Sequence, residues 1–179
     1  MIGLKRGTVK LVHYNPNWPQ VFEQEKKLLQ NVFGRTIIAI EHIGSTAIAG
    51  IYSKPVIDIN IGVESFETAR NMIEKFKEIN YEFRPFVPGY TIEELRSQEL
   101  YVKGPDYNRT HYVHVTIFNG AYWKNNLQFR DFLRNNQSIA KEYSELKEKL
   151  AGKYPLNRKA YTDNKDKFIK SVLSICNQQ

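Results

Sequence analysis

A glycine–serine turn and an aspartate on a nearby apolar segment are the residues of this sequence best suited to phosphate chemistry. Gly44 and Ser45 follow the apolar, β-branched run 36–43, and Asp58 lies inside a second such run, 55–63. A glycine leaves backbone N–H groups accessible, and with a neighbouring hydroxyl these groups can hold a phosphate. A carboxylate in so apolar a segment needs a compensating partner, and a divalent cation that also binds phosphate oxygens is one such partner.

The two-residue alternation of a strand decides which side chains share a face with Asp58. In an extended segment Asn60 points to the same side as Asp58, and the isoleucines between them point to the other. In the run 110–118 the same alternation places His114 on a polar face, as a metal ligand, a general base or a histidine that only makes core hydrogen bonds. We predict that Asp58, Asn60 and His114 point into one cleft beside Ser45.

Four further residues could contact an anion at such a site. Thr46 comes directly after the turn, Lys54 precedes the strand of the aspartate, and Arg109 and Arg130 carry guanidinium groups that suit phosphate oxygens. Each has a simpler alternative, because a hydroxyl can complete a turn and an arginine is often half of an ion pair. Asp58 could likewise be a structural acid that is paired with Lys54 or Arg109.

Two lysines nearer the C-terminus could also lie at this anion site or on the protein surface. Lys147 could also contact a phosphate, or form a surface ion pair. Lys165 follows Tyr161 by one helical turn, where a lysine is more typical of the surface.

The order of helices and strands indicates an α/β protein (α+β-like), with a small mixed sheet flanked by helices and a helical C-terminal part. Apolar spacing predicts a helix over 18–33, with Pro19 in its first turn and Gly34 at its C-terminal cap. A second helix is capped by Ser65, a short one lies around 92–97, and three follow from about residue 121, separated at 135–136 and at 152–155. Strands are predicted over 9–14, 36–43, 55–63, 81–86, 100–103 and 110–118.

Length and composition are those of an ordinary globular protein. The 179 residues suit a single domain over 1–179, and the hydrophobic share of 41% and charged share of 25% are average. No run reaches the roughly 20 apolar residues that span a bilayer, and residues 1–10 lack the apolar segment of a secretory signal. We expect a cytoplasmic protein with no membrane partner.

The charge balance favours an anionic partner without identifying it. A net charge of +7 raises the local concentration of nucleotides, coenzymes or nucleic acids. Nucleic acid is the less favoured partner, because the sequence has no single-strand motif and its basic residues alternate with acids at helical spacings. Cys176 is the only cysteine, which excludes an intrachain disulfide and a thiolate metal cage.

Longer runs of residues add a family resemblance. The run Glu41-His42-Ile43-Gly44-Ser45-Thr46-Ala47, followed by Lys54-Pro55 and Ile57-Asp58-Ile59, resembles the GrpB-like branch of the nucleotidyltransferase superfamily. Other motifs fit in the same order: Tyr14-Asn15-Pro16-Asn17-Trp18, Arg109-Thr110-His111-Tyr112-Val113-His114-Val115, Phe129-Arg130-Asp131-Phe132-Leu133-Arg134, Tyr143, Leu146-Lys147, Tyr161 and Lys165. The resemblance runs over about residues 9–168. It implies the nucleotidyltransferase fold, a turn that holds nucleotide phosphates, and strand acids that hold Mg²⁺.

One departure from the superfamily pattern separates two hypotheses of function. The position of the second strand acid is occupied by Asn60, a neutral residue that bridges metal ions poorly. The first hypothesis is a nucleotide- or coenzyme A-binding protein with degenerate catalysis, and fused family members that resemble partners of dephospho-coenzyme A kinase make the coenzyme class reasonable. The second is a Mg²⁺-dependent nucleotidyltransferase with an unidentified acceptor, in which Asp58 and His114 hold metal and Lys54 or Arg109 stabilises developing charge. The departure favours binding over catalysis.

Overall fold

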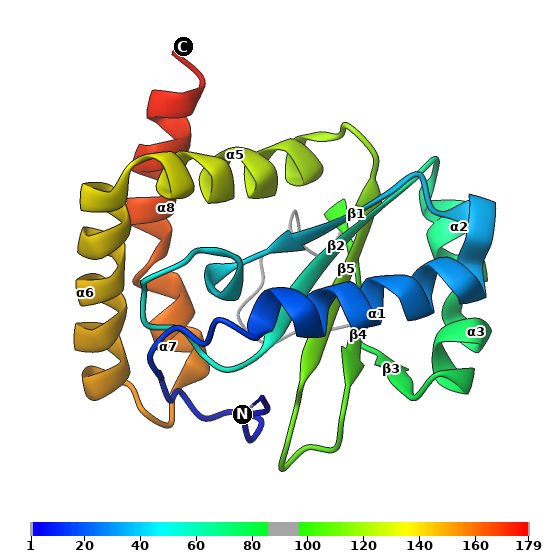
Figure 1. The fold of residues 1–179 in the computed structure, drawn as a ribbon, viewed down its shortest axis with the longest axis horizontal. Coiled ribbons are helices and arrows are strands. Elements are labelled where there is room, and N and C mark those ends of the chain that lie inside the picture. The colour runs from blue at the N-terminus through cyan, green and yellow to red at the C-terminus, as the bar shows by residue number, and fades with distance from the viewer. Residues whose placement is uncertain (1, 86–96, 179) are drawn as a thin grey trace.

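The computed structural model describes residues 2–85 and 97–178, and these contain one five-stranded sheet in the order β1-β2-β5-β4-β3 (Figure 1). The central strands β2 and β5 are parallel, and the other neighbouring pairs are antiparallel. The strands are β1 (Ala39–Ile43), β2 (Ile57–Val63), β3 (Tyr81–Phe83), β4 (Glu99–Lys103) and β5 (His111–Ile117). The expected mixed sheet is confirmed.

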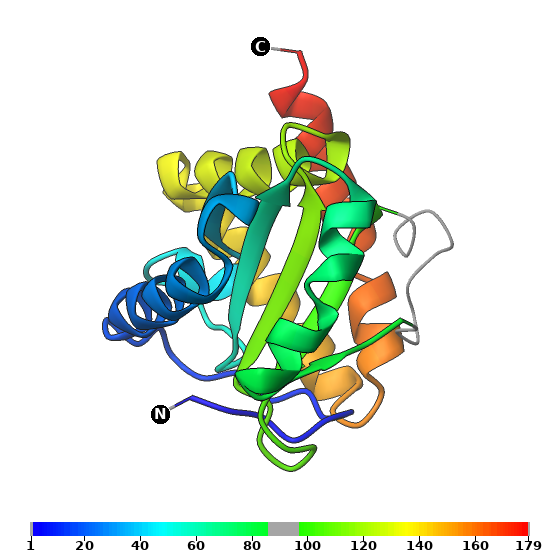
Figure 2. The ribbon, with the colours of Figure 1, turned by 90° about the vertical axis from the view of Figure 1, so that its right-hand side faces the viewer.

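Helices cover both faces of this sheet (Figures 1 and 2). One face packs against α1 (Trp18–Phe33), α2 (Phe66–Asn71) and α3 (Ile73–Glu78) in the main apolar core. The C-terminal helices lie on the other side and are α5 (Ala121–Asn135), α6 (Gln137–Lys153), α7 (Arg158–Asp163) and α8 (Asp166–Cys176). The expected fold class, helices around a mixed sheet with a helical C-terminal part, is therefore observed.

Helix α1 begins and ends where its sequence pattern predicts. Its apolar residues at helical spacing, among them Trp18, Phe22 and Leu29, are buried against the sheet. Burying a side chain of this size stabilises the fold by roughly 1.5–3 kcal/mol. Pro19 occupies the first turn, and Gly34 ends the helix with a φ of 53°, a conformation that favours glycine.

Strand β2 separates an apolar layer from a polar one. Ile57, Ile59 and Ile61 are completely buried on the side of α1. Asp58 and Asn60 alternate with them and therefore face the C-terminal helices. Two residues further on, a Cβ at Gly62 would lie only 2.8 Å from the Phe118 ring and 3.1 Å from Trp123 of α5. Helix α5 thus closes the polar face at the C-terminal end of β2.

Several predicted boundaries differ from the structure for local reasons. The predicted strand 9–14 contributes only one bridge, in which Val12 exchanges backbone hydrogen bonds with Ser53. Strand β2 begins at Ile57 rather than at Pro55, which has no N–H to donate. Strand β1 begins at Ala39, after the 3₁₀ turn η1 (Gly34–Thr36).

The remaining differences concern the helices and β3. The helix capped by Ser65 is divided at Met72 into α2 and α3, and the third C-terminal helix is divided into α7 and α8. Strand β3 ends at Phe83, while residue 86 and most of the helix predicted around 92–97 lie outside the described residues. Among the helices of the described ranges, none has the length and apolar character needed to cross a bilayer.

Candidate functional site

The turn that leaves β1 fits closely against Asp58 on β2. Gly44 has a φ of 68°, and a Cβ at this position would lie 2.5 Å from a carboxylate oxygen of Asp58. Only glycine satisfies both restrictions without displacing the aspartate. Ser45 begins the 3₁₀ turn η2 (Ser45–Ala47), is partly exposed, and is hydrogen-bonded to the Tyr143 hydroxyl. The structure therefore brings the predicted turn and the predicted aspartate into contact.

His114 lies beside Asp58 with a defined orientation. Its Nε2 atom is 3.8 Å from a carboxylate oxygen of Asp58, and its Nδ1 is hydrogen-bonded to Gln98 Oε1. When the proton is on Nδ1, this nitrogen donates to the Gln98 oxygen and Nε2 has the free lone pair that binds a metal ion. When Nε2 is also protonated, it points its proton toward the Asp58 carboxylate.

The donor set around Asp58 fits Mg²⁺ only in part. A carboxylate oxygen suits Mg²⁺, whereas an imidazole nitrogen suits softer transition metals. Within the residues that the structure describes, no group of three or more His, Cys, Asp and Glu side chains is placed to hold a metal. A cation between Asp58 and His114 would therefore depend on oxygens from a ligand to complete its coordination.

The groups around Asp58 favour the charged form of its carboxyl group. Burial raises its pKa, whereas the hydrogen bond and charge of His114 lower it. The positive charges of Lys54 and Arg158 lower it further, and the pKa lies below its usual value. Asp58 is consequently ionised at neutral pH.

Asn60 completes the trio that the alternation argument predicts. It is opposite His114 in the β2–β5 ladder and completely buried. The Thr116 hydroxyl lies 3.1 Å from Asn60 Oδ1, while the amide nitrogen of Asn60 has no hydrogen-bond partner among the described residues. Asp58, Asn60 and His114 thus share one face of the sheet, as expected, and their chemical roles remain predictions.

Four neighbouring cationic side chains are called here the lysine cluster: Lys54, Lys147, Arg158 and Lys165. Asp58 interacts electrostatically with Lys54, Arg158 and Lys165, whereas Lys147 lies near Lys54 and Lys165. The Nζ atoms of Lys54 and Lys165 are 5.7 and 4.7 Å from the centre of the Tyr161 ring. Lys147 donates a hydrogen bond to the Tyr52 carbonyl, and its Nζ lies 4.7 Å from the Tyr143 ring centre. Among the described residues, no carboxylate lies within 4.0 Å of these three ammonium groups.

The three lysines of the lysine cluster have no bound carboxylate among the described residues, and their pKa values are lowered. Burial and repulsion from Arg158 lower the pKa of Lys165 to about 8, although Asp58 acts in the opposite direction. Burial and neighbouring cations hold the pKa values of Lys54 and Lys147 well below their usual range. An anionic ligand would relieve this repulsion and raise the pKa of each lysine toward its usual value.

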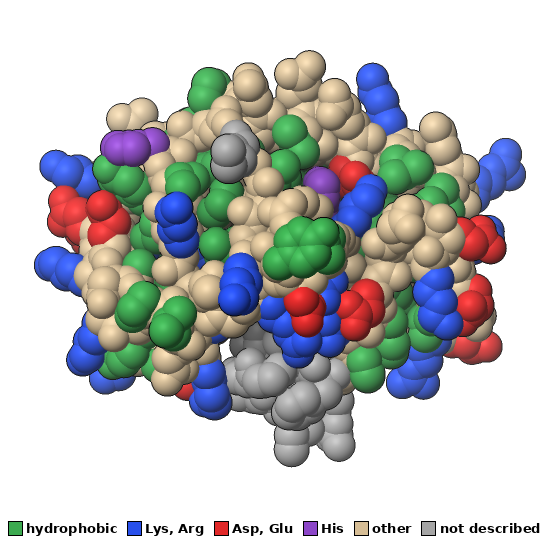
Figure 3. Space-filling model, turned by 90° about the horizontal axis from the view of Figure 1, so that it is seen from below, with side chains coloured by type: hydrophobic (Ala, Val, Ile, Leu, Met, Phe, Trp, Pro, Cys, Tyr) green, Lys and Arg blue, Asp and Glu red, His purple; other side chains and the backbone are tan. Residues whose placement is uncertain are grey.

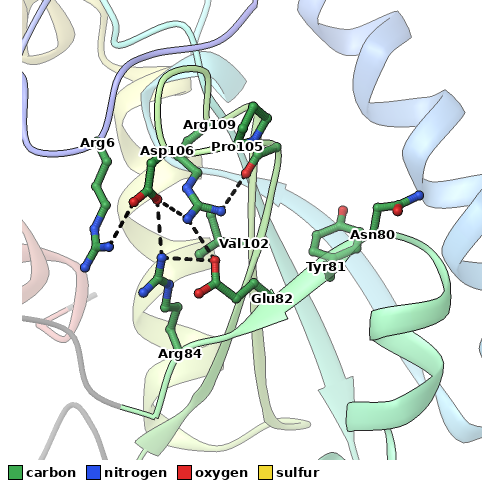
Figure 4. Close-up of a pocket in the computed structure, with 10 residues that line it drawn as sticks. Arg6, Asn80, Tyr81, Glu82, Arg84, Val102, Pro105, Asp106 and Arg109 are labelled. Atoms are coloured by element: carbon green, nitrogen blue, oxygen red, sulfur yellow. Dashed lines mark hydrogen bonds and ion pairs between the residues drawn. The ribbon is translucent and has the colours of Figure 1, made fainter.

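Three residues predicted to contact phosphate form structural contacts. Arg109 donates hydrogen bonds to Glu82, Asp106 and the Gly104 carbonyl, so its guanidinium is engaged in ion pairs at the base of the β4–β5 hairpin (Figure 4). Arg130 donates to Glu41, Asp131 and the His42 carbonyl, which ties α5 to β1. Thr46 is buried between His42 Nε2, at 3.0 Å, and the Val56 carbonyl, at 3.2 Å.

These positions agree with the simpler alternatives that the sequence left open. Thr46 and Arg130 support the turn from behind, and Arg109 stabilises the hairpin. Conversely, the structure adds Arg158 and Gln98, for which the sequence carries no signal. The sequence does show Lys165 one helical turn after Tyr161, but this spacing is more typical of a surface lysine than of a lysine in a site.

Comparison with known proteins gives consistent matches over most of the chain. A family model described as GrpB protein matches residues 8–174. The chain is 36% identical over 178 residues to the glutamate-rich protein GrpB of Alkalihalophilus pseudofirmus, covering 97% of this chain and 99% of that protein. The UPF0157 protein YqkA of Bacillus subtilis is 37% identical, with 92% of this chain matching 46% of YqkA.

One solved structure and one shorter sequence segment of another protein are also similar to this chain. The crystal structure of the conserved protein GrpB from Enterococcus faecalis is similar with a TM-score of 0.81 and 33% identity, covering 93% of this chain and 96% of that one. A shorter segment of 81 residues is 33% identical to a dephospho-CoA kinase of Mycolicibacterium paratuberculosis, and it covers 44% of this chain and 20% of the kinase.

Proposed function

Because this chain belongs to the GrpB family, we propose that it binds a phosphorylated small molecule of the nucleotide or coenzyme A type, with weak or absent catalysis. The observation that carries the proposal is the lysine cluster, whose three lysines lie near one another with no carboxylate within 4.0 Å of their ammonium groups among the described residues. Neighbouring ammonium groups that lack a bound carboxylate repel one another. A diphosphate or triphosphate would supply the missing negative charge.

The ligand's phosphates would lie between the turn and the lysine cluster. Backbone groups of Gly44 and the hydroxyl of Ser45 would hold one phosphate, since this part of the chain is partly exposed. Lys54 and Lys165 would neutralise phosphate charge from the side of Tyr161. A divalent ion held by Asp58 and His114 would bridge phosphate oxygens and screen their charge.

The neutral side chain at Asn60 favours binding over group transfer. Nucleotidyl transfer stabilises developing negative charge through metal ions that carboxylates hold. Asp58 is the one carboxylate of the trio, and an amide oxygen is a weaker metal ligand. The partial likeness to a dephospho-CoA kinase supports a ligand that carries an adenylyl group and phosphates.

A second candidate function is Mg²⁺-dependent nucleotidyl transfer to an acceptor hydroxyl. The contact between His114 and Asp58 favours it, because a neutral Nε2 could accept a proton from an acceptor. Rapid pyrophosphate release from nucleoside triphosphates, lost in Asp58→Ala, would establish this activity and overturn the binding-only proposal.

Calorimetric titration tests the proposal directly. The purified chain would be titrated with tripolyphosphate, the four nucleoside triphosphates and coenzyme A, each with Mg²⁺, with Mn²⁺ and without metal. We expect binding of at least one of these ligands, strengthened by a divalent ion. The absence of binding for every ligand under all three conditions would refute the proposed function.

A further inference from the structure

Two buried amide side chains on either side of His114 have unpaired nitrogens. Asn60 is completely buried and Gln98 is 4% exposed. Within the part of the chain that the structure describes, neither Asn60 Nδ2 nor Gln98 Nε2 has a hydrogen-bond partner. Buried polar groups are satisfied in most folded proteins, because an unpaired one destabilises the folded chain. Two such groups beside one candidate ligand residue therefore call for an explanation.

The oxygen atom of each amide is already hydrogen-bonded, and this hydrogen bond orients the amide group. Asn60 Oδ1 accepts a hydrogen bond from Thr116, and Gln98 Oε1 accepts one from His114 Nδ1. Rotating the Asn60 amide by half a turn would pair its nitrogen with Thr116 and leave its oxygen unpaired. One polar atom of Asn60 therefore lacks a protein partner in either orientation.

These amides lie at the end of the polar face away from Lys54, where Glu41 of β1, opposite Asn60, is neutralised by Arg130 at 2.6 Å. A strand rises about 3.3 Å per residue, so the Cα of Asn60 is about 7 Å from that of Asp58. This step leads away from Lys54, which precedes the strand, and toward Gly62, where α5 closes the face. The ring of Tyr122 from α5 lies 6.4 Å from the His114 ring, centre to centre. The face thus changes from cationic to charge-balanced and aromatic within a few residues.

We propose that Asn60 and Gln98 form a neutral subsite that binds the base edge of a nucleotide whose phosphates lie at the lysine cluster. A base edge is uncharged and presents both hydrogen-bond donors and acceptors, which matches two amides in either orientation. The rings of His114 and Tyr122 provide an aromatic wall for the base. Both amide nitrogens are covered by protein atoms, so binding of a base requires the covering side chains to move aside.

This inference rests on the proposed function but has a separate test. Calorimetry compares tripolyphosphate with the four nucleoside triphosphates, all with Mg²⁺, in the wild type and in Asn60→Leu. Leucine has a similar size and removes the unpaired atom, while the Thr116 hydroxyl keeps its second acceptor, the Ile61 carbonyl, at 3.3 Å. Asn60→Ala is the second variant in case Asn60→Leu does not fold.

We expect one nucleotide to bind the wild type about tenfold more tightly than tripolyphosphate, which is the effect of one or two good hydrogen bonds. In the variant this advantage falls to about twofold or less, tripolyphosphate affinity is unchanged, and the melting temperature is unchanged or higher. The melting temperature should not fall, because the variant removes a buried polar atom that destabilises the folded chain when it has no hydrogen-bond partner.

Four outcomes are distinguishable. Equal affinity of all nucleotides and tripolyphosphate in the wild type would overturn the base subsite and leave the phosphate site intact. An advantage that survives in Asn60→Leu, with a lower melting temperature, would show that the amide serves a structural role and would also overturn it. If nucleotides bind and tripolyphosphate does not, and Asn60→Leu weakens nucleotide binding, the result would support the base subsite and contradict phosphate binding at the lysine cluster. No binding at all would contradict both.

Discussion

Two groups of cations in this protein differ in how their charges are balanced. The first, called here the arginine cluster, consists of Arg6, Arg84 and Arg109 and lines an open hollow with Glu82 and Asp106 (Figure 4). Each guanidinium has a carboxylate partner, at 3.3 Å for Arg6, 3.0 Å for Arg84 and 2.8 Å for Arg109. On the face seen in Figure 3, cationic and anionic side chains adjoin one another in the same way.

The lysine cluster has the opposite character. Lys147 is buried and Lys54 and Lys165 are partly exposed, and among the described residues no carboxylate lies within 4.0 Å of their ammonium groups. Each guanidinium of the arginine cluster is already paired with a carboxylate, so the arginine cluster needs no ligand to balance its charge. The three lysines of the lysine cluster have no such carboxylate partner among the described residues and repel one another, so a bound anion would explain them. Charge balance, rather than the number of cations, distinguishes a binding site from a surface network.

The largest expected effect follows from filling the turn beside the lysine cluster. Ser45→Trp would place an indole where the phosphate is proposed to lie, and we expect it to weaken binding about 100-fold or more. Ser174→Trp is the matched control, because Ser174 is exposed on α8. Calorimetry with the best nucleotide measures both. Equal affinity of the two variants would place the ligand elsewhere.

Removal of one cation of the lysine cluster should have the next largest effect. Lys165→Gln is expected to weaken binding of tripolyphosphate about tenfold, as for loss of one charge-assisted hydrogen bond. Lys167→Gln removes the same charge from an exposed position two residues away on α8 and should change affinity by about twofold or less. If the two variants bind alike, only the net charge of the protein contributes, and the lysine cluster is not a site.

A second carboxylate on the polar face should strengthen metal binding. Asn60→Asp places an acid two residues after Asp58 on the same face, and we expect a several-fold lower Kd for Mg²⁺. Without metal the two carboxylates repel each other, which raises a pKa and lowers stability. Thermal melts with and without Mg²⁺ measure the effect. A melting temperature that Mg²⁺ raises no more than in the wild type would show that the two side chains do not face one cation.

The lysine cluster should also affect the pH dependence of stability. Lys165 has a pKa of about 8 in the folded chain, below its usual value near 10.5. The folded state therefore binds fewer protons than the unfolded state between these values, and the contribution of Lys165 to stability rises as pH is raised from about 8 to 10.5. Chemical unfolding across this window should show a smaller rise in Lys165→Gln than in the wild type. Parallel curves would contradict a depressed lysine pKa.

The smallest effect is expected in the arginine cluster. Arg84→Gln removes two partly exposed ion pairs, with Glu82 and Asp106, and we expect a stability loss of about 1 kcal/mol or less and a change in nucleotide affinity of about twofold or less. Equilibrium unfolding and calorimetry measure the two quantities. A tenfold loss of affinity would indicate that the ligand binds at the arginine cluster, in the hollow shown in Figure 4, and not at the lysine cluster.

Local backbone geometry explains which parts of this site the sequence could predict. Alternation along a strand is a property of neighbouring residues, so Asp58, Asn60 and His114 were assigned to one face before their register was known. Their register, with Asn60 opposite His114, depends on long-range pairing and comes only from the structure. The turn at Gly44 was also visible, because glycine and serine have local conformational preferences.

Long-range packing explains what the sequence could not predict. Arg158 and Lys165 reach Asp58 only because the C-terminal helices fold back over the polar face of the sheet. Arg109 looked equivalent to Lys54 in the sequence, yet Glu82 from another strand and Asp106 from the hairpin neutralise it. The partners of a charged residue are set by tertiary structure, which one sequence does not reveal.

The central claim is that phosphate binds at the lysine cluster and not at the arginine cluster. A crystal structure with tripolyphosphate and Mn²⁺, measured at the manganese absorption edge, tests it most directly. We predict an anomalous peak between Asp58 and His114, with phosphate density beside Ser45 and Lys165. Phosphate density in the hollow of Arg6, Arg84 and Arg109, with none beside Asp58, would contradict the claim.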